Sequence, residues 1–166
     1  MTTDRARVWA AVAGFAGLIL GMAATVVLQG EQSATQSASR RKVIRPEKIP
    51  NTGLPYSAAI LVGNTLYLAG TIGEDTANNI VPGGIEAETR QALANVSQVL
   101  KAAGMTLQDV TSVTVYITSF EDFAKFNEVY QQAFPKSPPA RATVQVAALI
   151  GGAKVELQMT AVKTEP

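Results

Sequence analysis

The sequence contains no histidine and no cysteine among its 166 residues. These two absences exclude Ser-His-Asp and Cys-His nucleophilic pairs, zinc held by histidine or cysteine, iron–sulfur clusters and disulfides. They also remove imidazole, the side-chain base whose ordinary pKa lies nearest neutral pH. Any chemistry must therefore depend on carboxylates, arginine, tyrosine, lysine, hydroxyls, amides and bound water. The lack of cysteine says nothing about the compartment, since a cysteine-free domain tolerates either redox environment.

Charge is scarce as well. Asp, Glu, Lys and Arg make up 16% of the chain, and the formal net charge is only +1. A nucleic-acid-binding domain usually carries a strongly basic face, so we expect no nucleic-acid partner. We also expect no metal site and no cofactor. The length suits one domain with an appendage.

The longest run without a charged residue is Val8 to Leu28. A helix of this length spans about 30 Å, the thickness of a bilayer's hydrocarbon core. We predict a single-pass transmembrane anchor over residues 8–28, in contact with membrane lipid and preceded by a short flank of residues 1–7. A cleaved signal peptide and a buried soluble helix are the alternatives. The run is long for a signal peptide, and no small-residue cleavage site follows directly.

Residues 29–50 are polar, first rich in Ser, Gln and Ala and then basic. This composition predicts a flexible linker before a folded domain of residues 51–166. Arg5 and Arg7 lie close to the anchor and favour export of the domain, whereas the larger number of distant basic residues after it favours the opposite side. The side stays open, with a slight preference for the extracytoplasmic or periplasmic one.

The folded domain shows alternating strand and helix patterns. The predicted strands are Ala59–Val62, Thr65–Ala69, Val110–Thr118, Ala142–Ala148 and Lys154–Val162. The predicted helices are Ile85–Ala103 and a second one from Ser119 to about Phe134. This order predicts an α+β domain, in which two helices pack on one face of a mixed or antiparallel sheet.

Arg141 begins an otherwise uncharged predicted strand, directly after Pro138-Pro139-Ala140. Its guanidinium is always charged and presents a planar fork that binds a carboxylate through two parallel hydrogen bonds. Arg141 is therefore a candidate anion-binding residue. The alternative is an arginine at the rim of the domain that forms a surface ion pair.

Glu156 lies inside the last predicted strand. Alternation places Val155 and Leu157 on one face of that strand and Glu156 and Gln158 on the other. If the second face borders a cleft, a partly buried carboxylate there orients a water or accepts its proton. If the face is open to solvent, Glu156 is an ordinary surface residue.

Eight segments, in their order and spacing, resemble a known family. They are Pro55-Tyr56-Ser57, Val62–Gly70, Glu88–Asn95, Ala102–Gly104, Val113–Thr118, Phe123–Tyr130, Pro138–Val144 and Val155-Glu156. Together they look like the RidA/YjgF family of reactive-intermediate deaminases across the whole predicted domain. The resemblance implies a chorismate-mutase-like fold with a six-stranded mixed sheet and two helices on one face. It also implies a homotrimer with three clefts between subunits.

The resemblance implies an activity. Members hydrolyse reactive imine or enamine acids, of the 2-aminoacrylate type, to 2-keto acids and ammonia. Arg141 matches the family arginine that holds the substrate carboxylate, and Glu156 matches the glutamate associated with the attacking water. An imine is already electrophilic, which fits a chain that lacks the usual nucleophile and metal ligands.

Four further residues match family positions that line the cleft: Tyr56, Gly70, Asn127 and Thr143. Tyr56 and Asn127 carry no weight by themselves, and Thr143 stands where some members have cysteine. The segment Ala69–Gly73 and the loop Glu74–Asn79 depart from the family pattern, which puts the substrate range in doubt. The alternative function is a non-catalytic, membrane-tethered trimer that binds small carboxylated ligands or a partner protein.

Overall fold

The computed structural model describes residues 41–46 and 55–163. The predicted flank 1–7 and anchor 8–28 lie outside the described residues, as does most of the predicted linker. Of the helices in the described part, none has the length and apolar character needed to cross a bilayer. The anchor and the side of the membrane therefore stay predictions.

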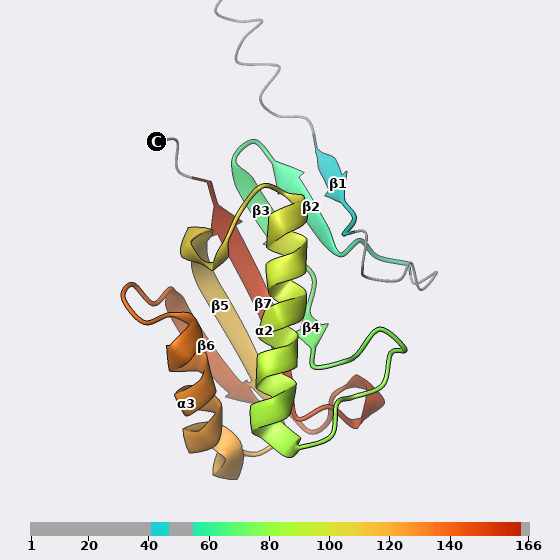
Figure 1. Cartoon of the computed structure of the whole chain (residues 1–166), viewed down its shortest axis with the longest axis vertical. Helices are drawn as coiled ribbons and strands as arrows, with labels where there is room; N and C mark the ends of the chain where they lie inside the picture. Colours follow the sequence, from blue (N-terminus) through green and yellow to red (C-terminus); the bar gives the residue numbers. More distant parts are fainter. Residues whose placement is uncertain (1–40, 47–54, 164–166) are drawn as a thin grey trace, which may run out of the picture. The chain divides into compact units, whose positions relative to one another are not determined.

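The described chain folds into one mixed sheet with two helices (Figure 1). The strands are β1 (Lys42–Ile44), β2 (Ala59–Val62), β3 (Thr65–Leu68), β4 (Thr71–Ile72), β5 (Val110–Ile117), β6 (Ala140–Gln145) and β7 (Val155–Val162). The helices are α2 (Gly84–Ala102) and α3 (Phe123–Ala133), with 3₁₀ turns at Leu107–Asp109, Phe120–Asp122 and Ile150–Gly152. The prediction of an α+β domain is confirmed.

The strand order is β1-β2-β3-β7-β5-β6, and β4 also pairs with β7. All pairs are antiparallel except β5 with β6, which run parallel. The long strand β7 therefore contacts β3, β4 and β5, and β6 forms an edge of the sheet. Both helices cover the same face (Figure 1).

The structure corrects the expected linker and the expected six strands. Residues 42–44 form β1 and pair with β2, with Lys42 opposite Leu61 and Ile44 opposite Ala59. The sheet thus has seven strands, and the folded unit begins at Arg41. The pair Val43-Ile44 has the β-branched side chains that strands favour. The basic residues on both sides of this pair gave the segment the composition of a linker.

The second predicted helix is interrupted at its start. Its first residues form the 3₁₀ turn Phe120–Asp122, and α3 begins only at Phe123. The side chain of Ser119 accepts a hydrogen bond from the Glu121 N–H and caps this turn. The strand predicted over Ala142–Ala148 is β6, which begins two residues earlier, at Ala140, and ends at Gln145.

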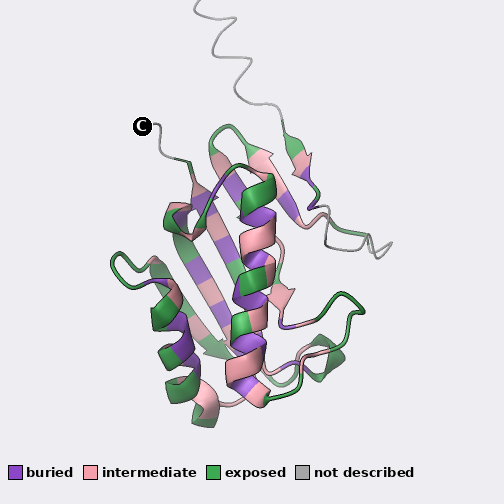
Figure 2. Ribbon diagram, in the orientation of Figure 1, coloured by how far each residue is buried: buried purple, intermediate pink, exposed green. Residues whose placement is uncertain are grey.

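The core lies between the helices and one face of the sheet (Figure 2). Alternate residues of β5 and β7 are buried there: Val113, Val115, Ile117, Val155, Leu157 and Met159. Their neighbours along each strand must point to the opposite face, because successive strand side chains alternate. We call that opposite face, which no described helix covers, the open face.

We predict that Ile44→Ala destabilises the domain by about 2–4 kcal/mol, because it truncates a buried aliphatic side chain. Ile44 is only 3% exposed and belongs to the main core. The free energy of unfolding of the full chain, measured by urea denaturation, tests this. Lys42→Ala in the same strand is the control, since Lys42 is exposed and should change stability by less than about 0.5 kcal/mol. Equal stability of the two variants would contradict a core role for β1.

Candidate active site

Arg141 lies on the edge strand β6 and points to the helix side of the sheet. Its parallel partner on β5 is Val113, whose side chain is buried in the core. Its guanidinium carbon lies 4.7 Å from the ring centre of Tyr130, 5.5 Å from that of Phe126 and 5.7 Å from that of Phe123. These rings of α3 hold the cation by cation–π attraction.

The contacts of Arg141 do not support the alternative of a surface ion pair. Between residues 41 and 163, the described part holds one ion pair, from Lys154 to Asp122, and Arg141 takes no part in it. A guanidinium that packs against aromatic rings still has N–H donors at the edge of its plane. Arg141 therefore combines a held position with donors suited to a carboxylate ligand.

Thr143 and Asn127 lie near Arg141 on the same side of the sheet. Thr143 follows two residues later on β6, is half-buried, and pairs with the buried Val115. Asn127 on α3 is four residues after Phe123 and three before Tyr130, so it shares their helix face. We refer to Arg141, Thr143 and Asn127 as the arginine half-site.

Glu156 lies on the open face. Its position on β7 alternates with the buried Val155 and Leu157, and its partners are Ile72 on β4 and Tyr116 on β5. Its side chain is half-buried and lies against the backbone of Gly70, where a β-carbon would collide with Oε1 of the carboxylate. A side chain at position 70 would therefore displace the carboxylate of Glu156 from the place it occupies beside the backbone.

Tyr56 lies in the chain that precedes β2, two residues before Ala58. The N–H of Ala69 donates to the carbonyl of Ala58 at 2.9 Å, which aligns the segment before β2 with the segment after β3. The Tyr56 side chain is 64% exposed. We refer to Tyr56, Gly70 and Glu156 as the glutamate half-site.

The two half-sites lie on opposite faces of the sheet. A single chain thus presents an anion-binding group beside α3 and a carboxylate on the open face, with the sheet between them. All six residues predicted from the sequence fall into these two groups. The sequence did not reveal the separation, because the face of Arg141 depends on the parallel pairing of β6 with β5.

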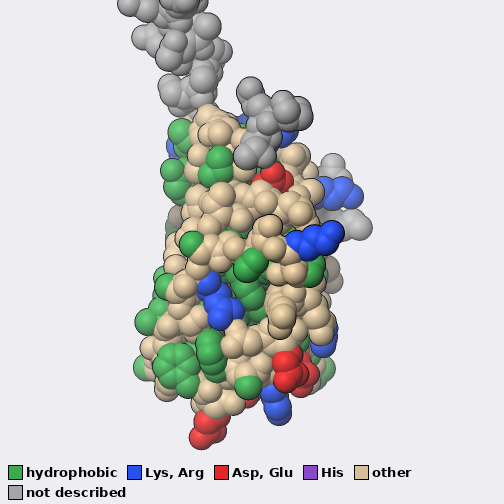
Figure 3. All heavy atoms as spheres, turned by 90° about the vertical axis from the view of Figure 1, so that its left-hand side faces the viewer, with side chains coloured by type: hydrophobic (Ala, Val, Ile, Leu, Met, Phe, Trp, Pro, Cys, Tyr) green, Lys and Arg blue, Asp and Glu red, His purple; other side chains and the backbone are tan. Residues whose placement is uncertain are grey.

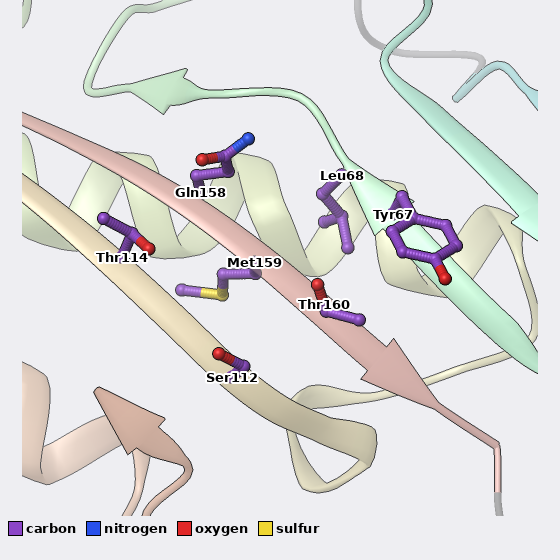
Figure 4. Close-up of a pocket in the computed structure, with 7 residues that line it drawn as sticks. All are labelled: Tyr67, Leu68, Ser112, Thr114, Gln158, Met159 and Thr160. Carbon is purple, nitrogen blue, oxygen red and sulfur yellow. The ribbon is translucent and has the colours of Figure 1, made fainter. Parts of the chain in front are cut away.

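A cavity of about 230 Å³ lies on the open face (Figure 4). It is lined by Tyr67, Leu68, Ser112, Thr114, Gln158, Met159 and Thr160. The lining is rich in hydroxyl and amide groups and includes no charged side chain. None of the predicted site residues lines it, and a period-two pattern of Ser, Thr and Gln in β5 and β7 was its only signal in the sequence.

The loop that departs from the family pattern is held by its own side chains. Asp75 accepts hydrogen bonds from the N–H groups of Ala77 and Asn79 at 2.8 and 3.0 Å. These bonds hold the pKa of the Asp75 carboxyl below its usual range. Burial, and then the neighbouring Asp75, raise the pKa of Glu74.

Over residues 41–46 and 55–163, no cluster of acidic side chains is arranged to hold a metal ion.

Tyr130 is the most perturbed group beside Arg141. Burial raises the pKa of Tyr130 to about 12, although the positive charge of Arg141 works in the opposite direction. Its hydroxyl is buried and has no hydrogen-bond partner among the described residues. Tyr130 is therefore neutral at physiological pH and acts on Arg141 through its ring.

Figure 3 shows the edge of the molecule that α3 and β6 form. Hydrophobic side chains gather there around a hollow, and basic side chains border it.

Comparison with known proteins gives a consistent assignment. The family described as Endoribonuclease L-PSP matches residues 47–163. A bovine protein named 2-iminobutanoate/2-iminopropanoate deaminase is 45% identical over 124 residues, which cover 74% of this chain and 90% of the relative. A RutC family protein of Pyrococcus horikoshii is 44% identical over 124 residues, which cover 74% of this chain and 98% of the relative.

Solved structures agree with the fold. RidA from an Antarctic Psychrobacter superposes with a TM-score of 0.70 at 36% identity, covering 74% of this chain and 99% of that one. TdcF from E. coli, solved with bound serine, gives a TM-score of 0.69 at 32% identity over the same shares. The similarity covers the domain that carries both half-sites.

We predict that Tyr130→Phe leaves the stability at pH 7 unchanged or raises it by up to about 1 kcal/mol, since the buried hydroxyl has no described partner. The folded domain holds this phenolic proton up to a pH of about 12, whereas the unfolded chain releases it near 10. The stability of the wild type therefore falls as the pH rises from about 10 to 12, and Tyr130→Phe lacks this particular loss.

Two measurements check this prediction. The difference between the phenolate absorption titrations of wild type and Tyr130→Phe should have a midpoint near pH 12, and the variant should lose less stability over that pH range. Tyr67→Phe is the control, because Tyr67 is 53% exposed. A difference titration with its midpoint near 10 would contradict the buried, neutral Tyr130.

Proposed function

Since this chain belongs to the RidA/YjgF family, also described as Endoribonuclease L-PSP, we propose that it is an imine deaminase. Its substrates are reactive 2-imino and enamine acids of the 2-aminoacrylate type, and its products are 2-keto acids and ammonia. Relatives of about 45% identity are named 2-iminobutanoate/2-iminopropanoate deaminase, which supports an enzyme of this class.

The observation that carries the proposal is that Arg141 is packed against aromatic rings and pairs with no described carboxylate. Three aromatic rings fix its guanidinium from the side of α3, and no described carboxylate pairs with it. A 2-imino acid carries a planar carboxylate next to the reacting carbon. Two parallel hydrogen bonds from Arg141 hold that carboxylate and so fix the position of the carbon.

The reaction follows from this placement. An enamine first tautomerises to the imine, and Glu156 then accepts a proton from a water whose oxygen adds to C2. The electron pair of the C=N bond moves to nitrogen, which is protonated to give a carbinolamine. The C–N bond then breaks as the hydroxyl loses its proton. Ammonia is released, and the 2-keto acid remains. One water is consumed for each ammonia released.

The separation of the half-sites supports a site built from two chains. Arg141 of one copy and Glu156 of another can face one cleft only if the β6 edge of the first meets the open face of the second. Such a contact is heterologous, and it closes into a ring when the rotation allows. A homotrimer with three equivalent clefts satisfies this geometry.

A non-catalytic ligand-binding trimer is the second candidate. It would use Arg141 in the same way but would not need Glu156. The absence of a side chain at Gly70 leaves room for the Glu156 carboxylate beside it, which a trimer that only binds ligands would not need. This favours the catalytic role.

We predict that Arg141→Ala lowers kcat/KM for 2-iminopropanoate, generated in situ, by about 10²-fold or more, because a charge-assisted bidentate contact is lost. Arg141→Lys should recover only part of the loss, since lysine keeps the charge but lacks the fork. The decay of the imine above its spontaneous hydrolysis is the measurement. Arg90→Ala is the matched control, because Arg90 is exposed and bonds Gln132 instead. Equal rates for wild type and Arg141→Ala would refute the deaminase proposal.

We predict that two inactive variants restore activity when they share an oligomer. Arg141→Ala and Glu156→Gln chains, co-expressed at equal levels, should give about a quarter of wild-type activity, because each half-site then comes from the intact chain half of the time. Each variant alone, and the double variant, should be inactive. If the mixture is as inactive as its components, the site does not combine the two chains.

A further inference from the structure

The mechanism leaves one buried carboxylate unused. Glu88 on α2 is 4% exposed and, with Thr89, is one of two buried polar side chains in the described core. Thr89 is satisfied inside its own helix by the carbonyl of Ile85. Glu88 instead accepts a hydrogen bond from the backbone N–H of Lys154 at 2.6 Å, 66 residues further along the chain.

Lys154 connects several elements. Its carbonyl accepts a hydrogen bond from the N–H of Thr118 at 3.1 Å, and its ammonium donates to the Asp122 carboxylate at 2.9 Å. The bond to Asp122 raises the pKa of the Lys154 ammonium. Lys154 directly precedes β7 and lies two residues before Glu156. The position of its backbone therefore sets the start of the strand that carries the proposed base.

The same helix also holds β4, the other neighbour of Glu156. A β-carbon at Gly73 would collide with the backbone of Glu88, so the chain leaving β4 lies directly against α2. Two turns along the helix, the Asn95 side-chain amide donates to the carbonyls of Ile72 and Glu74 at 3.2 and 2.9 Å. Ile72 is the β4 partner of Glu156.

We propose that Glu88, assisted by Asn95, is a positioning residue that holds the Glu156 carboxylate at Gly70 by fixing β7 and β4 against α2. This inference rests on the proposed role of Glu156 as the base. The hydrogen bond of the Glu88 carboxylate goes to a backbone N–H, so its effect passes through the backbone. A buried carboxylate is costly unless it is hydrogen-bonded, and this one is satisfied by the amide that begins the catalytic strand.

Arg141 is held by the rings of α3, and the hydrogen bond of Glu88 goes to the Lys154 backbone and to none of these residues. The arginine half-site lies on β6 and α3, whereas Glu88 acts on β7 and β4. Loss of Glu88 should therefore lower kcat and leave KM nearly unchanged, because substrate is still bound through its carboxylate. A displacement of about 1 Å at a reacting group is enough to cost up to about 10²-fold in rate.

The test compares Glu88→Ala, Glu88→Gln and Asn95→Ala in the full chain, with Ser97→Ala as the control. Ser97 is on the same helix, but its hydroxyl bonds only the carbonyl of Leu93 within α2. We expect a fall in kcat of about tenfold or more for Glu88→Ala, with KM within about twofold of wild type. Glu88→Gln keeps an acceptor for the Lys154 N–H and should recover most of the loss. If Glu88→Ala does not fold, Asn95→Ala decides, with an expected fall in kcat of several-fold.

A second readout does not need activity. The side-chain carboxyl carbon of Glu156, assigned in the NMR spectrum by its absence in Glu156→Gln, should shift in Glu88→Ala and return in Glu88→Gln. If the wild type is inactive but the Glu156 resonance still shifts in Glu88→Ala, the deaminase function is refuted and the positioning role is kept. An active wild type, in which neither kcat nor the resonance responds to Glu88→Ala or Asn95→Ala, would overturn the positioning role alone.

Discussion

The alternation of side chains along β7 is the constraint on which the rest of the structure depends. Every second residue from Val155 to Ala161 is buried under the helices, which fixes the register of β7 against β3, β4 and β5. A shift by one residue would bring Glu156 into the core and expose Leu157, so the hydrophobic effect holds the carboxylate on the open face. The energy of the core thereby decides on which side of the sheet the proposed base lies.

The two half-sites are held by different kinds of interaction. Arg141 is fixed by the rings of α3, which attract a cation without using its N–H donors. Glu156 is held by backbone geometry, since Gly70 leaves room for the carboxylate and α2 bonds both the neighbouring strand β4 and the residue that precedes β7. Both groups are therefore arranged before a ligand arrives, which lowers the entropy cost of binding and reaction.

Local patterns predicted most of the secondary structure, because periodicity and turn residues act over short distances. The Gly63-Asn64 turn indicated the hairpin of β2 and β3, and Gly104 indicated the end of α2. The strand β1 was missed, since a three-residue strand has too little pattern and its neighbours are basic. The boundaries of β6 and α3 differ from the predicted ones by a few residues, and at α3 the first predicted residues form a 3₁₀ turn.

The site was harder to predict, because its geometry arises from contacts between distant parts of the chain. The residues themselves were found through their resemblance to a family and not through their local chemistry. The face of Arg141 follows from its parallel pairing with Val113, and no feature near Arg141 in the sequence encodes that pairing. No local pattern marks Glu88 as buried, because glutamate is seldom buried and its partner Lys154 is 66 residues away.

The strand β1 also determines how the domain responds to mechanical force. A pull on the chain before Arg41 reaches the sheet through Lys42–Ile44, which pair with β2 at the edge of the sheet. This ladder of three residues is far shorter than the pairing of β5 with β7 at the centre. Under such a pull, the three pairs of β1 with β2 are the first part of the sheet to bear the load.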